Sequence, residues 1–225
     1  MSRLTENIWN NTFCFDQISD PKLRITDTID WTANDLEIWE NTVFREIKNW
    51  NVVEYKWLQN FIKIKKNNQS IYIFDNHNHA LGYRLYEYKN WNIDFWIKLV
   101  HLDQHTDMNT SEYALDLQNP TFEVYNVWNF IQPAINCGLI SNVEQINTEY
   151  KLLNFKLPKY DYILDIDLDF RAPEMSIEKY TETIEKTKKL ISKSRVVTIA
   201  TSPYFLDPNR KSTKQSMTLL PLTTA

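Results

Sequence analysis

Two short acidic motifs are the part of the sequence best suited to chemistry. Both place polar residues at alternate positions, and these residues are Asp103, His105 and Asp107 in the first and Asp165, Asp167 and Asp169 in the second. Side chains at alternate positions of an extended segment point the same way, so each motif presents its triplet to one side. The five carboxylates of the two motifs would raise one another's pKa sharply if they converged without cations. Taken singly, the first motif is also typical of a solvated loop and the second of a capping cluster. Together they predict a metal site in which four aspartates balance two divalent ions.

The histidines support this interpretation, because all four lie in two short segments, 75–79 and 101–107. A chain that used histidine for ordinary packing would scatter it. His77 could add a neutral nitrogen ligand from the end of the strand that precedes it. Oxygen and imidazole ligands without thiolate favour Mn²⁺, with Fe²⁺, Co²⁺ or Zn²⁺ as alternatives. Two such ions, roughly 3.5–4 Å apart and bridged by carboxylates, would generate a hydroxide that attacks a carbon or a phosphorus centre.

Short apolar runs precede the polar motifs and predict the elements that position them. The expected strands cover 71–74, 97–100, 162–164 and 195–200. The expected helices cover 80–88, 123–137 with a kink at Pro133 and a C-cap at Gly138, and 176–193 starting at Ser176. Strands that alternate with helices predict a three-layer α/β/α fold with a mostly parallel sheet. Ligands of such folds bind beyond the carboxyl ends of the strands, which is where the motifs lie.

The length of the chain fits a single domain over residues 1–225, with the clearest pattern over 70–205. We expect an amphipathic helix over 36–47 and an exposed loop over 63–68. The role of residues 1–60 stays open between binding a leader segment, dimerisation and completion of the core.

Composition excludes several classes of protein. A net charge of −4 and a pI of about 5.6 are unlike those of a nucleic-acid binder. No run approaches the length of a membrane span, and the first residues lack the pattern of a signal peptide. The two glycines, Gly82 and Gly138, are too few for glycine-rich phosphate loops. Cys14 and Cys137 lie far apart and form no metal-ligand spacing. We expect a soluble, cytoplasmic protein without a nucleic-acid or membrane partner, and homo-oligomerisation stays open.

Three segments resemble the metal-binding motifs of the arginase/agmatinase ureohydrolases. VHLDQHTDMNTS at 100–111 is similar to their second motif, and LDIDLD at 164–169 is similar to their third. Asn76-His77 stands at the place of their first motif, 26 residues before Asp103. The chain lacks the glycines of the first and third motifs, and it is shorter than a typical arginase.

Five segments together resemble more closely a small arginase-related family that includes the peptide arginases of ribosomal-peptide (RiPP) biosynthesis. These segments are DNHNHAL, HLDQHTDM, NFIQPAINCGLI, DIDLDF and VTIATSPYF. Peptide arginases convert arginine side chains of a precursor peptide to ornithine. The resemblance implies an arginase/deacetylase-like fold and a site that holds two Mn²⁺ ions.

The resemblance also implies roles for individual residues. The implied metal ligands are His77, Asp103, His105, Asp107, Asp165 and Asp167. Asp103 and Asp165 would bridge the two ions, and Asp107 would orient the hydroxide. His79 or His101 would protonate the leaving nitrogen, since the pKa of histidine lies near the working pH. A packing role is the alternative for either histidine.

Substrate contacts are implied for four further residues. Asn109 matches an asparagine that in arginases contacts the α-carboxylate end of the substrate. The candidates for the acid that clamps the guanidinium are Asp169, Asp207 and Glu123. Asp207 equally suits an ordinary turn.

The sequence therefore predicts a Mn²⁺-dependent peptide arginase that hydrolyses arginine side chains of a precursor peptide to ornithine and urea. One alternative is another C–N hydrolase on the same scaffold, a small-guanidine ureohydrolase or a deacetylase. A second alternative is a peptide-binding module with a vestigial site.

Overall fold

The structure is a computed structural model that describes residues 23–26, 38–48, 51–58, 61–74, 76–111, 114–118, 125, 127–171 and 178–202. The first three ranges supply strands β1 (Leu23–Thr26), β2 (Ile38–Lys48) and β3 (Asn51–Leu58). Among the helices of all the described residues, none is both long enough and apolar enough to cross a membrane.

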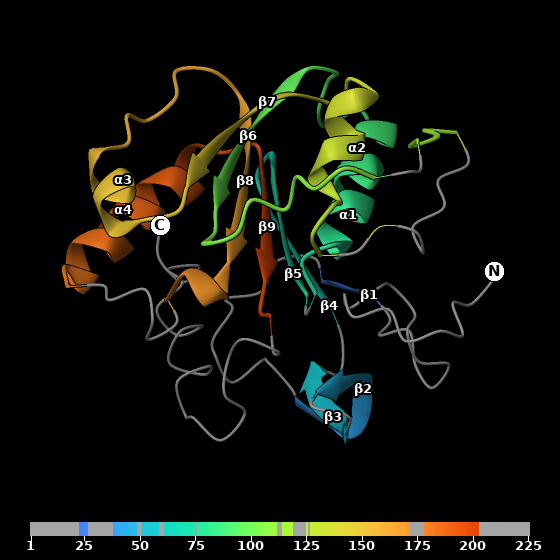
Figure 1. Ribbon diagram of the computed structural model, residues 1–225. Helices are drawn as coiled ribbons and strands as arrows, with labels where there is room; N and C mark the ends of the chain where they lie inside the picture. Colours follow the sequence, from blue (N-terminus) through green and yellow to red (C-terminus); the bar gives the residue numbers. More distant parts are fainter. Residues whose placement is uncertain are drawn as a thin grey trace.

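A seven-stranded sheet forms the centre of the molecule (Figure 1). In sheet order its strands are β1, β4 (Phe61–Lys66), β5 (Gln69–Phe74), β9 (Val196–Ala200), β8 (Tyr162–Asp167), β6 (Ile97–Leu102) and β7 (Ile140–Ile146). Strands β4 and β5 are antiparallel, and every other neighbouring pair in this sheet is parallel. The mostly parallel sheet that the sequence predicts is therefore confirmed.

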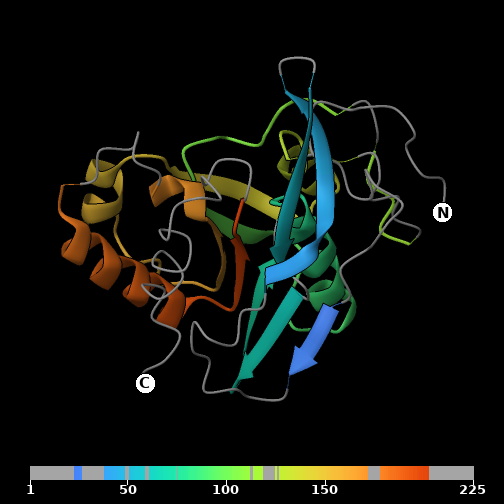
Figure 2. The same cartoon turned by 90° about the horizontal axis from the view of Figure 1, so that it is seen from below.

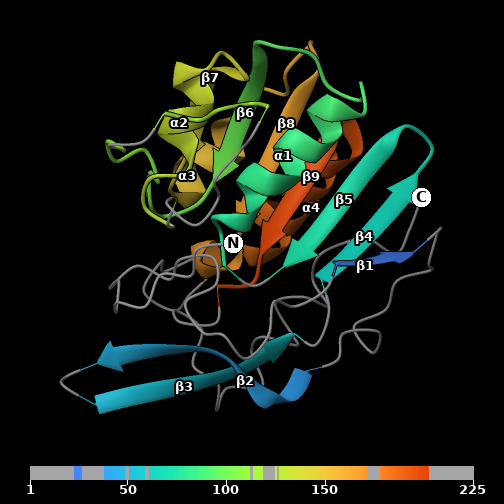
Figure 3. The ribbon, with the colours of Figure 1, turned by 90° about the vertical axis from the view of Figure 1, so that its right-hand side faces the viewer.

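Helices cover both faces of this sheet. Helices α1 (His79–Lys89) and α2 (Ile131–Asn136) lie on one face, and α3 (Glu149–Asn154) and α4 (Tyr180–Lys193) lie on the other (Figures 1 and 3). Each of the four connects one strand of the parallel set to the next along the chain. The result is the three-layer α/β/α architecture that this alternation requires.

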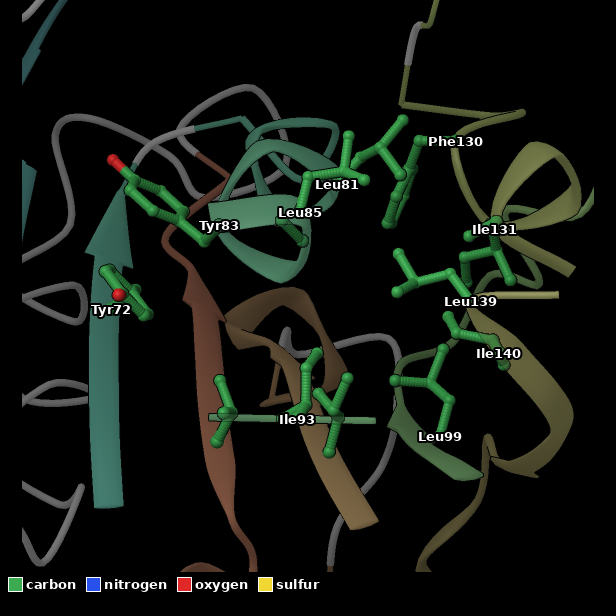
Figure 4. Packing of buried hydrophobic residues seen from close by; sticks show 14 of the residues in the cluster. Tyr72, Leu81, Tyr83, Leu85, Ile93, Leu99, Phe130, Ile131, Leu139 and Ile140 are labelled. Carbon is green, nitrogen blue, oxygen red and sulfur yellow. The ribbon is translucent and has the colours of Figure 1, made fainter. Parts of the chain in front are cut away.

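Two hydrophobic cores fill the space between the layers. In β6, Val100 and Leu102 pack in the core beneath α3 and α4, whereas Leu99 packs in the core beneath α1 and α2. This alternation follows from the period of two residues in a strand. Figure 4 shows the second core, where Leu81 of α1 and Ile131 of α2 lie among strand residues.

Most predicted elements of the parallel region are present. The four predicted strands are β5, β6, β8 and β9, and the helix predicted over 80–88 is α1. Helix α4 begins at Tyr180, and the predicted start at Ser176 lies outside the described residues. Strand β7 and helix α3 are not predicted.

The helix predicted over 123–137 is shorter in the structure. Of the described residues in this range, only those of α2 are helical, and the described residues that directly precede α2 form turns. Pro133 lies in the first turn of α2, where a proline removes no intrahelical hydrogen bond, so it causes no kink. Gly138 has a φ of 81° and donates its N–H to Ile135 O at 2.9 Å, which confirms its role at the C-terminus of the helix.

Two predictions for the N-terminal third are wrong. The helix expected over 36–47 is strand β2, which pairs with β3 in a separate two-stranded sheet (Figure 2). Both runs are rich in β-branched and aromatic residues, so strand pairing overrides the helical periodicity. The loop expected over 63–68 is largely strand β4, because Ile62 and Ile64 alternate into the core.

The sheet topology fixes the level of each acidic motif. Strands β5, β9, β8 and β6 are consecutive and parallel, so their carboxyl ends lie side by side. His101 pairs with Asp165, so Asp103 lies level with Asp167. Thr198 of β9 also pairs with Asp165. These side chains project toward α1 and α2.

Candidate metal centre

The polar motifs meet at the carboxyl edge of the parallel strands. His77 follows β5, Asp103 follows β6 and Asp167 ends β8, and all three side chains are buried. They form two levels. We define the upper layer as His77, Asp103, His105, Asp107, Asp167 and Asp169, and the lower layer as Arg84, His101, Asp165 and Thr198.

In the upper layer, carboxylates crowd around the imidazole of His77. Its Nδ1 atom lies 3.0 Å from Asp103 Oδ2, 3.1 Å from Asp107 Oδ2 and 3.2 Å from Asp167 Oδ2. None of these contacts has the direction of a hydrogen bond, and both ring nitrogens of His77 lack a hydrogen-bond partner. Oxygen and nitrogen atoms that face one another in this way are arranged as ligands around a point.

A second group in the upper layer is built around His105. Its Nδ1 lies 3.1 Å from Asp169 Oδ2 and 3.4 Å from Asp103 Oδ1. Both carboxylate oxygens of Asp169 are buried without a hydrogen-bond partner. The His105 side chain is 32% exposed, which makes this the side of the upper layer open to solvent.

The lower layer differs because protein groups satisfy its carboxylate. Arg84 Nη2 lies 2.6 Å from Asp165 Oδ2, and His101 Nδ1 lies 2.9 Å from the same oxygen. The Thr198 hydroxyl donates to Asp165 Oδ1. Burial alone would raise the pKa of Asp165, but the neighbouring guanidinium of Arg84 holds it well below its ordinary value.

Backbone and side-chain hydrogen bonds shape the two acidic motifs. Asp107 has a φ of 52°, a left-handed conformation that aspartate tolerates better than most residues. Asp167 receives the Ser202 hydroxyl at 2.5 Å. From β7, Gln145 Nε2 donates to the backbone oxygens of Asp103 at 3.0 Å and of His105 at 2.6 Å. The Gln145 side chain therefore stabilises the backbone of the turn that carries the first motif.

Without cations, the upper layer is short of positive charge. Burial is the largest influence on Asp169 and, with the negative charge of Asp167, raises its pKa well above the ordinary value. Burial also raises the pKa of Asp107 to about 6. The hydrogen bond with Asp103 raises the pKa of His105 to about 10. A bound cation would offset the negative charge of these buried carboxylates and would favour their ionised form.

Three groups of ligand atoms lie close enough together to hold a metal ion. They are His77 with Asp103 and Asp107, Asp103 with His105 and Asp169, and His77 with His101 and Asp165. The first two groups share Asp103 and contain buried atoms that lack hydrogen-bond partners. They fit a pair of cations. In the third group both oxygens of Asp165 already accept from protein donors, although Nε2 of His77 and Nε2 of His101 have no hydrogen-bond partner.

The two histidines expected as acids lie in the walls of the site. His101 is fully buried in the lower layer. His79 is the first residue of α1, and its ring packs against Phe61 with 4.6 Å between ring centroids. It also packs against Phe74, and it belongs to none of the three ligand groups.

The expected substrate residues fall at different places. Asn109 is exposed, and its N–H donates to Trp128 O at 2.9 Å. The Trp128 ring is close to that of His105, with 6.1 Å between centroids, and Trp128 is 41% exposed. Asp169 belongs to the upper layer. Asp207 and Glu123 lie outside the residues that the structure describes.

Four residues that contact the acidic motifs are not predicted from the sequence, namely Arg84, Gln145, Thr198 and Ser202. Arg84 carries the one signal that could have been found, since it falls among Leu81 and Leu85 on the apolar face of a predicted helix. Thr198 and Ser202 lie within the segment VTIATSPYF but have no chemical pattern of their own. Gln145 lies on a strand that the sequence does not predict.

Comparisons with known proteins show distant similarity to solved structures alone. No family model matches the chain, and no curated protein matches it. Among solved structures, the chain is similar to the crystal structure of a hypothetical agmatinase from Burkholderia thailandensis, with a TM-score of 0.47 and 11% sequence identity. The match covers 66% of this chain and 56% of that chain, so it spans little more than half the length of the agmatinase. Similarity at this level assigns neither an activity nor a substrate.

Proposed function

We propose that this chain is a metal-dependent hydrolase whose upper layer holds two divalent cations. His77, Asp103 and Asp107 would hold one cation, and Asp103, His105 and Asp169 would hold the other. Asp167 reaches both groups, through His77 and through the backbone of Asp169. The observation that carries the proposal is the set of buried ligand atoms without hydrogen-bond partners in this layer. Such atoms are costly unless a cation binds them.

This ligand set differs from the sequence prediction in the residues that it takes from the second motif. The prediction assigns Asp165 and Asp167, and we propose Asp167 and Asp169. Asp103 lies level with Asp167, so the two can face the same ion. Asp165 lies one level deeper, where it forms an ion pair with Arg84 and hydrogen bonds with His101 and Thr198.

Bound in the upper layer, a pair of divalent cations would supply a hydroxide near neutral pH and would stabilise negative charge that develops on the substrate. Oxygen and imidazole ligands favour Mn²⁺ for this role.

The substrate that we propose is an arginine side chain within a peptide, hydrolysed to ornithine and urea. The ureohydrolase-like order of the motifs supports this choice. On the open side, His105 is partly exposed near the Trp128 ring, and the backbone oxygen of Trp128 accepts from Asn109 N–H. Trp128 could contact the cationic side chain through its ring face, while Asn109 contacts the peptide.

Supporting roles suit the two histidines expected as acids. His101 lies beneath the cluster and orients Asp165 through its Nδ1. His79 packs between two phenylalanine rings and holds the start of α1 against β4 and β5. We propose that Asp107 orients the attacking water, since its carboxylate lies in the upper layer beside His77.

Mass spectrometry of arginine-containing peptides, incubated with the Mn²⁺-loaded protein, tests the proposed function. A net loss of about 42 Da per arginine is expected, because hydrolysis adds a water of about 18 Da and releases urea of about 60 Da. Free arginine and agmatine in parallel reactions distinguish a peptide substrate from small guanidines. Release of acetate from acetyl-lysine peptides, with arginine untouched, would contradict the proposal in favour of a deacetylase.

A further inference from the structure

Arg84 is the residue in this region that the proposed chemistry does not use. It lies on α1, and its side chain is fully buried. Nη2 pairs with Asp165 Oδ2 at 2.6 Å, and the guanidinium lies 5.3 Å from the centroid of the Phe130 ring. None of the three guanidinium nitrogens has a hydrogen-bond partner, so the ion pair with Asp165 is the polar contact of this charge. Burial of a permanently charged guanidinium with so few partners costs folding free energy. We therefore expect its positive charge to have a role in the site.

The charge of the acidic cluster gives a reason for it. Five carboxylates belong to the two layers, at positions 103, 107, 165, 167 and 169. Two divalent cations would balance four of these charges, and Arg84 balances the fifth. Because Arg84 contacts Asp165 in the lower layer, it supplies its charge without occupying the atoms of the upper layer that lack partners.

We propose that Arg84 is a built-in counter-charge of the metal centre. It pairs with Asp165 beneath the cations, and it preserves the fold of the metal-free protein by offsetting part of the carboxylate repulsion. Its positive charge also weakens the binding of cations above it, so that metal can be exchanged without unfolding. This inference rests on the proposed metal site.

The same helix offers a matched control. Lys63 of β4 forms a buried ion pair with Glu87 of α1 at 3.3 Å, and the Tyr72 hydroxyl donates to the same Glu87 oxygen. The pair joins α1 to the sheet, as Arg84 does, and none of its members belongs to a group of candidate ligands. Loss of Lys63 removes a buried cation from α1 packing but leaves the metal centre unchanged.

The experiment compares Arg84→Met, Arg84→Lys, Lys63→Met and the double variant Arg84→Met/Asp165→Asn. Thermal unfolding is measured in chelator and in excess Mn²⁺, and Mn²⁺ affinity is measured by titration calorimetry. For Arg84→Met we expect the metal-free midpoint to fall by about 10 °C, as for a broken buried ion pair. Mn²⁺ should recover most of this loss, and the Mn²⁺ dissociation constant should fall about tenfold, because binding and stability are linked. Arg84→Lys should keep an affinity within about threefold of the original, since it retains the charge.

The double variant and the control sharpen the test. Arg84→Met/Asp165→Asn should regain most of the metal-free stability, because neither charge is left without its partner. Lys63→Met should lower the midpoint equally with and without Mn²⁺ and leave the affinity unchanged. An unchanged or weaker Mn²⁺ affinity in Arg84→Met would overturn the inference. If Arg84→Met does not fold in chelator, the Mn²⁺ affinity of Arg84→Lys and the metal-free stability of the double variant test the inference in its place. Failure of the original protein to bind Mn²⁺ would instead overturn the proposed metal site.

Discussion

Asp165 and Asp169 come from the same motif and are both fully buried, yet their surroundings are opposite. Both oxygens of Asp165 accept from protein groups, and its pKa is held well below the ordinary value. Both oxygens of Asp169 lack a hydrogen-bond partner, and its pKa is raised well above the ordinary value. A buried carboxylate thus reports whether its counter-charge is part of the protein or has to be bound.

The contrast between Asp165 and Asp169 indicates that the two layers of the cluster have different roles. The lower layer has its own cation, Arg84, and holds the strand ends together. Among the residues that the structure describes, the upper layer contains no lysine or arginine, and its carboxylates are suited to binding ions. Substitution of the aspartate in the lower layer should therefore lower stability and leave the number of bound ions unchanged. Substitution of an aspartate in the upper layer should instead lower metal binding and leave the fold intact.

The largest effect should come from Asp103, which both ligand groups of the upper layer share. We expect Asp103→Asn to lose both cations and to lower the activity by at least about a thousandfold. The metal-free fold should survive, because a neutral amide relieves repulsion among the carboxylates. Metal content and peptide turnover measure the effect, with the exposed Asp161→Asn as the control. Full activity of Asp103→Asn would contradict the ligand assignment.

Asp165→Asn should have the next largest effect, and on stability. It leaves Arg84 as a buried charge without its partner, which should lower the free energy of unfolding by about 3–5 kcal/mol. Denaturant unfolding in chelator measures this change. A loss of less than about 1 kcal/mol would mean that the lower layer does not depend on this ion pair.

The pH dependence of stability should reverse when metal is present. Burial raises the pKa of Asp107 from 3.8 to about 6, and the hydrogen bond with Asp103 raises the pKa of His105 from 6.5 to about 10. Both groups bind protons more tightly in the folded state, so the stability that they contribute is present at low pH. It is lost as the pH rises through these folded values.

The stability of the metal-free protein should therefore fall between about pH 5 and about pH 8, whereas in excess Mn²⁺ it should rise, because the ligands bind cations in their deprotonated form. Thermal unfolding across this range, with chelator and with Mn²⁺, makes the comparison. Parallel curves in the two conditions would argue against cation binding by these groups.

The smallest effect should come from Gln145, which acts on the upper layer through the backbone. Gln145→Ala removes hydrogen bonds to the backbone oxygens of Asp103 and His105. We expect a loss of about 1–2 kcal/mol in stability and a severalfold weaker Mn²⁺ affinity. Gln132→Ala, which removes an exposed contact within α2, is the matched control and should change neither quantity. An equal effect of the two substitutions would exclude a positioning role for Gln145.

The gathering of the motifs was predictable from the sequence. Apolar runs ending at His77, Asp103 and Asp165 predict parallel strands, and parallel strands bring their carboxyl ends to one edge. The choice between Asp165 and Asp169 was not predictable in this way. The three aspartates of the second motif occupy alternate positions in the sequence, but Asp169 lies in a 3₁₀ helix (Leu168–Arg171) that follows β8 and that the sequence does not predict. The pairing of His101 with Asp165 fixes the level of the other two.

Other features depend on tertiary contacts that leave little trace in the sequence. Strand β7 lies at the edge of the sheet, and only its two ends are fully buried, so its apolar pattern is weak. Arg84 lies on a helix face where a long cationic side chain would ordinarily reach toward solvent. The pairing of β2 with β3 overrides a helical periodicity because the partner strand supplies the hydrogen bonds.

The central claim is that cations bind the upper layer and not the lower one. Counting the Mn²⁺ ions bound per chain in the original protein, Asp165→Asn and Asp169→Asn tests it most directly. Each variant is first checked for its fold by circular dichroism. The account predicts two ions in the original protein, two in Asp165→Asn and one in Asp169→Asn. Loss of an ion from Asp165→Asn, with both ions retained by Asp169→Asn, would contradict it.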